Sequence, residues 1–180
     1  MNQEKEIIIP LSKAKMALLM FACFVFVALG VCFVFAPPQG NHAIYNNPYI
    51  LFVIGIASII LFTFFAILYI KKMFDPKPGL IINNQGIWDN ATAVSAGLIP
   101  WKDILSIEEV EAYSQKFILV VVSNPEEYLN KVTNSFKRKA IEANFKQYGT
   151  PISISANGLK ISKNQLIKLL IEQSKKYKEQ

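Results

Sequence analysis

Acidic side chains are the first candidates for chemistry in this chain, because paired carboxylates can act as general acid and base. They cluster once, at Asp103, Glu108, Glu109 and Glu111. Successive residues of a strand point to opposite faces, so Glu109 and Glu111 share one face and Glu108 lies on the other. This spacing is typical of solvated strand charges rather than of a catalytic pair.

Residues that bind metals or act as nucleophiles are scarce. His42 is the single histidine, which excludes metal sites that need two histidines. Cys23 and Cys32 lie in one apolar run, and a helix would turn their side chains to nearly opposite sides. The sequence contains neither a Gly-rich phosphate loop nor a Gly-x-Ser-x-Gly motif. We therefore predict no catalytic residue, no metal site, no cofactor and no enzymatic activity.

Basic residues form the clearest charged cluster. Three of them are consecutive at positions 137–139, and another precedes them on the same predicted helix. Each cation near a bilayer surface contributes about 1 kcal/mol to binding anionic lipid. We interpret these cations as contacts with the membrane surface or a protein partner, with a solvated helix face as the alternative. A single arginine and the lack of interleaved aromatic residues argue against nucleic-acid binding. The candidate contact residues are Lys71, Lys72, Lys131, Lys137, Arg138 and Lys139.

The chain contains two uncharged apolar runs, residues 16–36 and 49–70, and all other segments are attached to them. A bilayer core about 30 Å thick requires about 20 helical residues, so the two runs predict a transmembrane hairpin. A cleaved signal peptide is the alternative for the first run, but the run is longer than the usual apolar region of a signal and a second run follows it. Neither run contains a charged residue that could carry ions or protons, so we interpret the hairpin as an anchor.

Small residues indicate how the two helices pack. Ala28, Cys32 and Ala36 recur every four residues on one helix face, which permits close approach of a second helix. Gly55 and Ser58 offer a small surface on the second run. We expect these residues to join the two helices. Formation of a homo-oligomer through the same face is the alternative.

Positive charge flanks the hairpin on one side only. Lys13 and Lys15 precede the first run, Lys71 and Lys72 follow the second, and residues 37–48 contain no Lys or Arg. Lysine and arginine in short flanking segments mark the cytoplasmic side. The sequence therefore predicts a multi-pass membrane protein with both termini in the cytoplasm.

The domain organisation follows from the position of the hairpin. In the leader, Ile7–Ile9 precede Pro10, and this pattern is consistent with either a short strand or an interfacial patch. The linker is too short to let the following domain move far from the bilayer. The predicted segments are a cytoplasmic leader (1–15), the transmembrane hairpin (16–72), a Pro-rich linker (73–78) and a cytoplasmic domain (79–180).

Apolar alternation in residues 79–180 predicts short antiparallel strands. Residues 80–82 and 87–89 flank a Gly-containing turn and indicate a hairpin. A long strand over 104–113, with a bulge near 108–109, precedes a doubly covered central strand over 116–123. Asn157-Gly158 indicates a further hairpin.

Two helices are predicted in the same domain. Asn124-Pro125 begins one that runs to about Phe145. Ser162 and Gln165 form a capping box for a second helix over residues 163–177. We predict an α+β fold in which these helices accompany a small antiparallel barrel or strongly bent sheet.

Several segments resemble a known family. The run Gly79-Leu-Ile-Ile-Asn-Asn-Gln-Gly-Ile-Trp88 and the run Ile99-Pro-Trp-Lys-Asp-Ile104 are similar to those of small bacterial two-helix membrane proteins with a pleckstrin-homology-like (PH-like) domain. The segments that begin at Asn124 and Gly149 resemble a narrower family of this kind, whose function is unassigned. The resemblance implies a PH-like barrel with an inserted helix, closed by a C-terminal capping helix, in the bacterial inner membrane.

The resemblance also bears on ligands. Lipid-binding PH domains carry basic residues in the first hairpin loop, whereas residues 83–86 carry none, which argues against phosphoinositide binding. Trp88 and Trp101 are expected to be core or barrel-rim anchors, and an open sheet edge could accept a strand from a partner.

These features favour a non-enzymatic, membrane-anchored binding or scaffold protein. Its predicted partner is a protein or the anionic membrane surface, in addition to the lipid bilayer itself. The first alternative is an immunity protein that neutralises a toxin acting at the membrane. The second is an accessory subunit of a transport or secretion complex.

Overall fold

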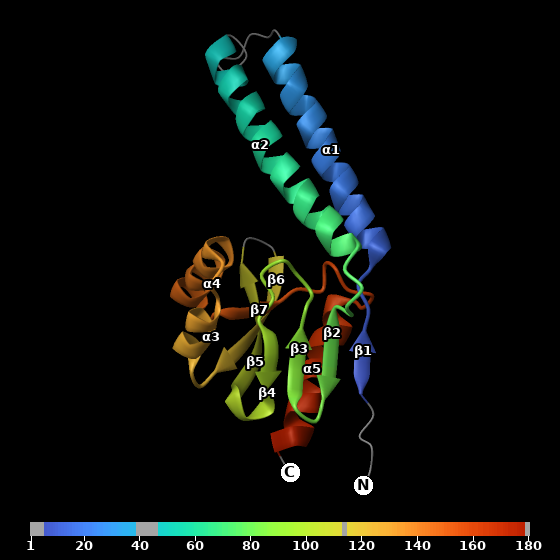
Figure 1. The fold of residues 1–180 in the computed structure, drawn as a ribbon, viewed down its shortest axis with the longest axis vertical. Coiled ribbons are helices and arrows are strands. Elements are labelled where there is room, and N and C mark those ends of the chain that lie inside the picture. Colours follow the sequence, from blue (N-terminus) through green and yellow to red (C-terminus); the bar gives the residue numbers. More distant parts are fainter. Residues whose placement is uncertain (1–5, 39–46, 113–114, 179–180) are drawn as a thin grey trace. The chain divides into compact units, whose positions relative to one another are not determined.

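A computed structural model of the 180-residue chain describes residues 6–38, 47–112 and 115–178. The chain divides into two compact units, and Figure 1 shows their helices and strands. One unit, Lys13–Asp75, is helical. The other joins the segment that ends at Ser12 to the chain that begins at Pro76. His42 and most of its loop lie outside the described residues.

The helical unit consists of α1 (Lys13–Phe35) and α2 (Pro48–Met73), which pack against each other. Asn47 caps α2, because its side-chain oxygen accepts hydrogen bonds from the backbone N–H groups of Tyr49 and Ile50. Both helices are long and apolar enough to cross a membrane. The two predicted apolar helices are thus present, with bounds within a few residues of those expected.

The second unit is an α+β fold with two antiparallel sheets (Figure 1). The first sheet has the order β1 (Ile7–Ile9), β2 (Leu80–Asn83), β3 (Gly86–Asp89) and β4 (Gly97–Pro100). The predicted hairpin around residues 83–86 joins β2 to β3. The isoleucines of the leader form a strand beside β2, which resolves the choice between a strand and an interfacial patch.

The second sheet has the order β5 (Ile104–Ala112), β6 (Gln115–Val122) and β7 (Ile152–Ile154). A single 3₁₀ turn, η1 (Trp101–Asp103), leads from β4 into β5. As predicted, β6 is the central strand, and its consecutive residues Ile118, Leu119 and Val120 are all buried. The irregularity in β5 lies between Ile104 and Ser106 rather than near residues 108–109, so the predicted bulge position is wrong.

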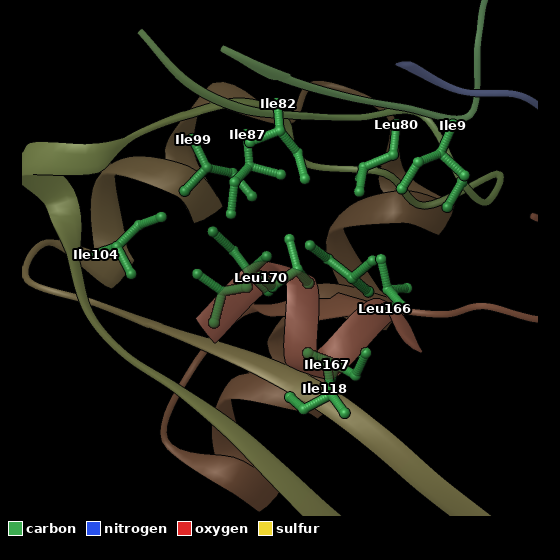
Figure 2. Packing of buried hydrophobic residues seen from close by; sticks show 14 of the residues in the cluster. Ile9, Leu80, Ile82, Ile87, Ile99, Ile104, Ile118, Leu166, Ile167 and Leu170 are labelled. Carbon is green, nitrogen blue, oxygen red and sulfur yellow. The ribbon is translucent and has the colours of Figure 1, made fainter. Parts of the chain in front are cut away.

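The hydrophobic core lies between the two sheets and contains α5 (Lys163–Lys178) (Figure 2). Leu166 and Leu170 of this helix point toward Leu80 and Ile82 of the first sheet. Ile118 of β6 approaches the helix from the second sheet. The strands do not close into a barrel, so the expected barrel with a helix capping its end is not confirmed.

The predicted inserted helix is two helices, α3 (Pro125–Lys131) and α4 (Ser135–Tyr148). The chain leaves the first helix at Val132, whose backbone is extended. Asn134 then begins the second, because its side-chain oxygen accepts a hydrogen bond from the Lys137 backbone N–H at 3.0 Å. The β-branched pair Val132-Thr133 followed by a good N-cap residue explains why the helix breaks here.

The hairpin predicted at Asn157-Gly158 is wrong. Leu159 pairs with Leu11 of the leader instead of with β7. The Ser12 N–H donates to the Gly158 carbonyl at 2.7 Å, and the Lys160 N–H donates to the Pro10 carbonyl at 2.9 Å. The segment after the turn therefore pairs with the leader, in the place that the turn sequence alone would give to β7.

Candidate functional site

The outer face of the first sheet carries several exposed apolar side chains of the α+β unit. Strand pairing aligns Ile8 with Ile81, Ile81 with Trp88, and Trp88 with Leu98. Their neighbours Ile9, Leu80, Ile87 and Ile99 are buried on the inner face. Side chains alternate between faces along a strand, so the aligned residues form one row across the outer face. The outer row consists of Ile8, Ile81, Trp88 and Leu98.

The outer row is accessible to solvent. Ile8 is 56% exposed, Trp88 and Leu98 are each 45% exposed, and Ile81 is half-buried. Antiparallel sheets that cover a core on one side normally carry polar residues on the other. A contiguous apolar surface rimmed by polar residues commonly marks an interaction site. The first sheet therefore covers the core with one face and presents an exposed apolar row on the other.

The positions that flank the outer row are nearly free of charge. Residues two positions from a member of the row lie on the same face of the sheet. At one end of the strands these residues are Pro10, Asn90 and Ala96. At the other end they are Glu6, Asn83 and Pro100, of which only Glu6 is charged. Lack of charge and the presence of an aromatic residue are features of the centre of protein–protein interfaces.

The loop that joins β3 to β4 holds Trp88 and Leu98, at one end of the row, in place. The buried carboxylate of Asp89 accepts hydrogen bonds from the Ala91 N–H at 2.9 Å and the Ala96 N–H at 3.1 Å. These two bonds fix both ends of the loop. Because Asp89 follows Trp88 directly, the same bonds fix the strand positions of Trp88 and Leu98.

The turn between β2 and β3 is equally constrained. A Cβ atom on Gly86 would lie 2.1 Å from the Ile99 carbonyl oxygen, so only glycine allows β3 and β4 to approach this closely. The Trp101 indole N–H donates to the Asn83 carbonyl at 2.8 Å. The Trp101 ring also stacks on Tyr177 of α5 with the ring centroids 4.9 Å apart. Trp101 is thus a structural anchor, as expected, whereas Trp88 faces solvent.

The predicted basic cluster is divided by the break between α3 and α4. Lys131 forms an ion pair with Glu127 at 2.6 Å, and this pairing lowers the pKa of the Glu127 carboxyl. Arg138 pairs with Glu142 at 2.9 Å. Lys137 and Lys139 lie on α4 near Arg138. Two of the predicted lipid-contacting cations therefore have acidic neighbours that oppose attraction to an anionic surface.

Lys71 and Lys72, the remaining predicted contacts, lie in the last turn of α2. Lys72 forms an ion pair with Asp75 at 3.0 Å. The structure places both lysines in the helical unit and the basic residues of α3 and α4 in the other unit.

Asp103 and Glu108 each have a hydrogen-bond partner of their own. Asp103 accepts a hydrogen bond from the Tyr128 hydroxyl at 2.9 Å. Burial raises the pKa of Tyr128, and the bond to Asp103 raises it further. Glu108 accepts a bond from the Ser106 hydroxyl at 2.6 Å. Within the described residues, no three His, Cys, Asp or Glu side chains come together to hold a metal ion.

A pocket of about 220 Å³ lies between α4, β7 and the loop after β3. Its polar groups include Thr92, Asn144 and Ser153, and the Asn144 amide donates to the Ser153 hydroxyl at 2.8 Å. The lining contains no charged side chain. The pocket is smaller than most small-molecule sites, which occupy about 300–1,000 Å³.

Helix packing in the hairpin uses only part of the predicted set. Gly30 of α1 and Gly55 of α2 lie against each other, since a Cβ on Gly30 would be 2.9 Å from the Gly55 carbonyl oxygen. The Ser58 hydroxyl donates to the Phe26 carbonyl at 3.0 Å. The predicted packing residues Gly55 and Ser58 thus contact α1. Ala28, Cys32 and Ala36 are exposed.

Sequence reasoning did not identify the outer row. The pattern that could have revealed it is a strand with apolar residues on both faces, as in Ile7–Ile9 and in the Ile-Trp pair of β3. Comparison with models of known protein families, with curated proteins and with solved structures gave no match. The site is therefore interpreted from its geometry alone.

Proposed function

We propose that this chain is a non-enzymatic, membrane-anchored binding protein that recognises another protein through the outer row of its first sheet. The observation that carries this proposal is the row of Ile8, Ile81, Trp88 and Leu98, which crosses all four strands and faces solvent. Burial of this apolar surface would contribute about 25 cal/mol per Å². The anchor is the two-helix hairpin, whose helices are long and apolar enough to cross a membrane. The sequence resemblance suggests the bacterial inner membrane.

Strand pairing supports the proposed membrane topology. β1 precedes α1 and β2 follows α2, yet the two strands are hydrogen-bonded neighbours. If both helices cross the membrane, the leader and the α+β unit must lie on the same side. The lysines that flank the hairpin favour the cytoplasmic side.

The proposed fold is a PH-like arrangement without a closed barrel. Its support is the sequence resemblance, together with two antiparallel sheets and a helix at the C-terminus. The uncharged turn at residues 83–86 does not favour phosphoinositide binding by such a domain.

A protein partner fits this surface better than anionic lipid does. The outer row and its flanks contain no Lys or Arg. Peripheral membrane binding normally combines apolar side chains with cations. The basic residues Lys131 and Arg138 lie elsewhere in the unit and are paired with glutamates. An immunity role and an accessory role in a transport complex both remain forms of this proposal, because each requires a bound protein.

Photocrosslinking of the full chain in its host membrane tests the proposal. Trp88 is replaced by benzoylphenylalanine, and the matched control carries the same residue in place of Leu105, which is 56% exposed on the other sheet. We expect a discrete protein adduct from position 88 that Leu98→Asp abolishes, and no such adduct from position 105. Adducts with lipid alone, or the same adducts from both positions, would refute a protein-binding row.

A further inference from the structure

We propose that the outer row binds the outer row of a second copy of this chain, so that two copies pair face to face as a symmetric dimer. This inference rests on the function proposed above and names its partner. Two-fold symmetry is the commonest arrangement of homo-oligomers, and it requires a surface that is complementary to itself.

The order of residues in the row meets that requirement. Across the sheet the order is Ile8, Ile81, Trp88 and Leu98. A two-fold axis through the middle of the row, parallel to the strands, sets Ile8 opposite Leu98 of the second copy. It also sets each Trp88 opposite the smaller Ile81 of the other copy. Sheets that pack in this way lie about 10 Å apart with their strands nearly aligned.

The same rotation suits two copies in one membrane. A rotation about the strand direction leaves that direction unchanged. Ile9 and Leu80 are paired at the end of the sheet from which the chain leads to α1 and α2. In the dimer, the ends that lead to the helices therefore lie together, as anchoring in a single bilayer requires.

Charge favours this face for self-association. The chain carries a net charge of +6, whereas the outer row and its flanking positions contribute no Lys or Arg, so pairing through this face brings no lysines of these positions together. On the outer face, Glu6 is the charged residue among the flanking positions, and the two-fold axis sets it opposite Pro100 of the second copy. The two Glu6 carboxylates stay apart across the width of the sheet.

The small size of the contact is compatible with the membrane setting. A stable interface between soluble proteins buries about 800 Å² on each partner, more than one row of side chains supplies. Confinement to one bilayer raises the effective concentration of the two copies, so a smaller contact is sufficient.

Crosslinking between differently tagged copies tests the geometry. Cys23 and Cys32 are first replaced by alanine, and one copy then carries Ile8→Cys while the other carries Leu98→Cys. A bis-maleimide with a reach of about 10 Å is added to native membranes. We expect the Ile8→Cys copy to couple to the Leu98→Cys copy. Two Ile8→Cys copies should not couple, because three strand spacings of about 4.8 Å and the gap between the sheets separate them.

The controls separate the possible failures. Lys139→Cys on α4 should give no adduct between copies, and Trp88→Arg should abolish the Ile8–Leu98 adduct without unfolding the chain. Equal coupling of every pair would overturn the two-fold geometry. No coupling of any pair, together with a discrete adduct to a different protein from benzoylphenylalanine at position 88, would overturn the dimer and leave the binding function standing. No coupling and no protein adduct would overturn both.

Discussion

Ile9 and Leu80 are paired on adjacent strands, although the entire helical hairpin separates them in the sequence. The Gly79 N–H donates to the Ile9 carbonyl at 3.0 Å and extends this pairing. The short leader is therefore an integral strand of the α+β unit. The sheet can form only after both helices have been made, and a fragment that begins after the hairpin would lack β1.

Substitution of Ile9 should reveal this dependence. Ile9 is 5% exposed and packs in the core, so Ile9→Ala should destabilise the unit by about 2–4 kcal/mol. Ile8→Ala changes the same type of residue one position away on the solvent face, and we expect it to cost about 0.5 kcal/mol or less. Thermal unfolding of the full chain in micelles, followed by tryptophan fluorescence, compares the two variants. Equal losses would mean that β1 is not part of the core.

The hairpin should be sensitive to side-chain size at Gly30 but not at Ala28. A Cβ on Gly30 would already meet the Gly55 carbonyl oxygen, so Gly30→Val must push α1 away from α2. Ala28 is exposed, and Ala28→Val should leave the packing unchanged. Circular dichroism during heating in micelles should show a lower unfolding temperature for Gly30→Val only. A greater loss for Ala28→Val would identify the Ala28 face as the true contact.

Tyr128 should make stability depend on pH in the alkaline range. Burial and the bond to Asp103 raise its pKa in the folded state, so folding favours the protonated hydroxyl. Its contribution is complete below the unfolded value of about 10 and falls as pH rises above it. Tyr128→Phe removes this ionisation and should flatten the loss of stability above about pH 10. Urea unfolding at pH 7 and pH 10.5 measures the free energy of unfolding of both proteins. An equal loss of this free energy between the two pH values in both proteins would contradict the prediction.

Local patterns in the sequence predicted the local structure well. The turn at residues 83–86 forms, and the capping box forms with Ser162 N–H donating to the Gln165 side chain at 3.2 Å. The Gln165 N–H donates back to the Ser162 hydroxyl at 3.3 Å. Both features depend on residues close together in the chain. The apolar runs were equally clear, because composition alone determines whether a helix suits a bilayer.

Long-range pairing could not be read from the sequence. Asn157-Gly158 has the composition of a hairpin turn, but Leu11 competes for the strand position beside Leu159 and occupies it. The outer row likewise depends on register across four strands. Trp88 and Trp101 look equivalent as sequence, yet Trp101 binds Asn83 and Tyr177 while Trp88 points outward. Only the pairing of β3 with β2 and β4 distinguishes them.

We predict that the outer face of the first sheet is covered when the protein is in its membrane. Labelling of single cysteines by a charged maleimide measures this directly, with Cys23 and Cys32 replaced by alanine and the vesicles oriented so that the α+β unit is accessible. Leu98→Cys reports on the outer row, and Leu105→Cys is the matched control on β5. We predict that Leu98→Cys reacts about tenfold more slowly than Leu105→Cys in native membranes. This ratio corresponds to about 1.4 kcal/mol in the free energy of exposing the thiol. After detergent dissociates the complex, the two rates should become similar. Equal rates in intact membranes would contradict the claim that this face binds a partner.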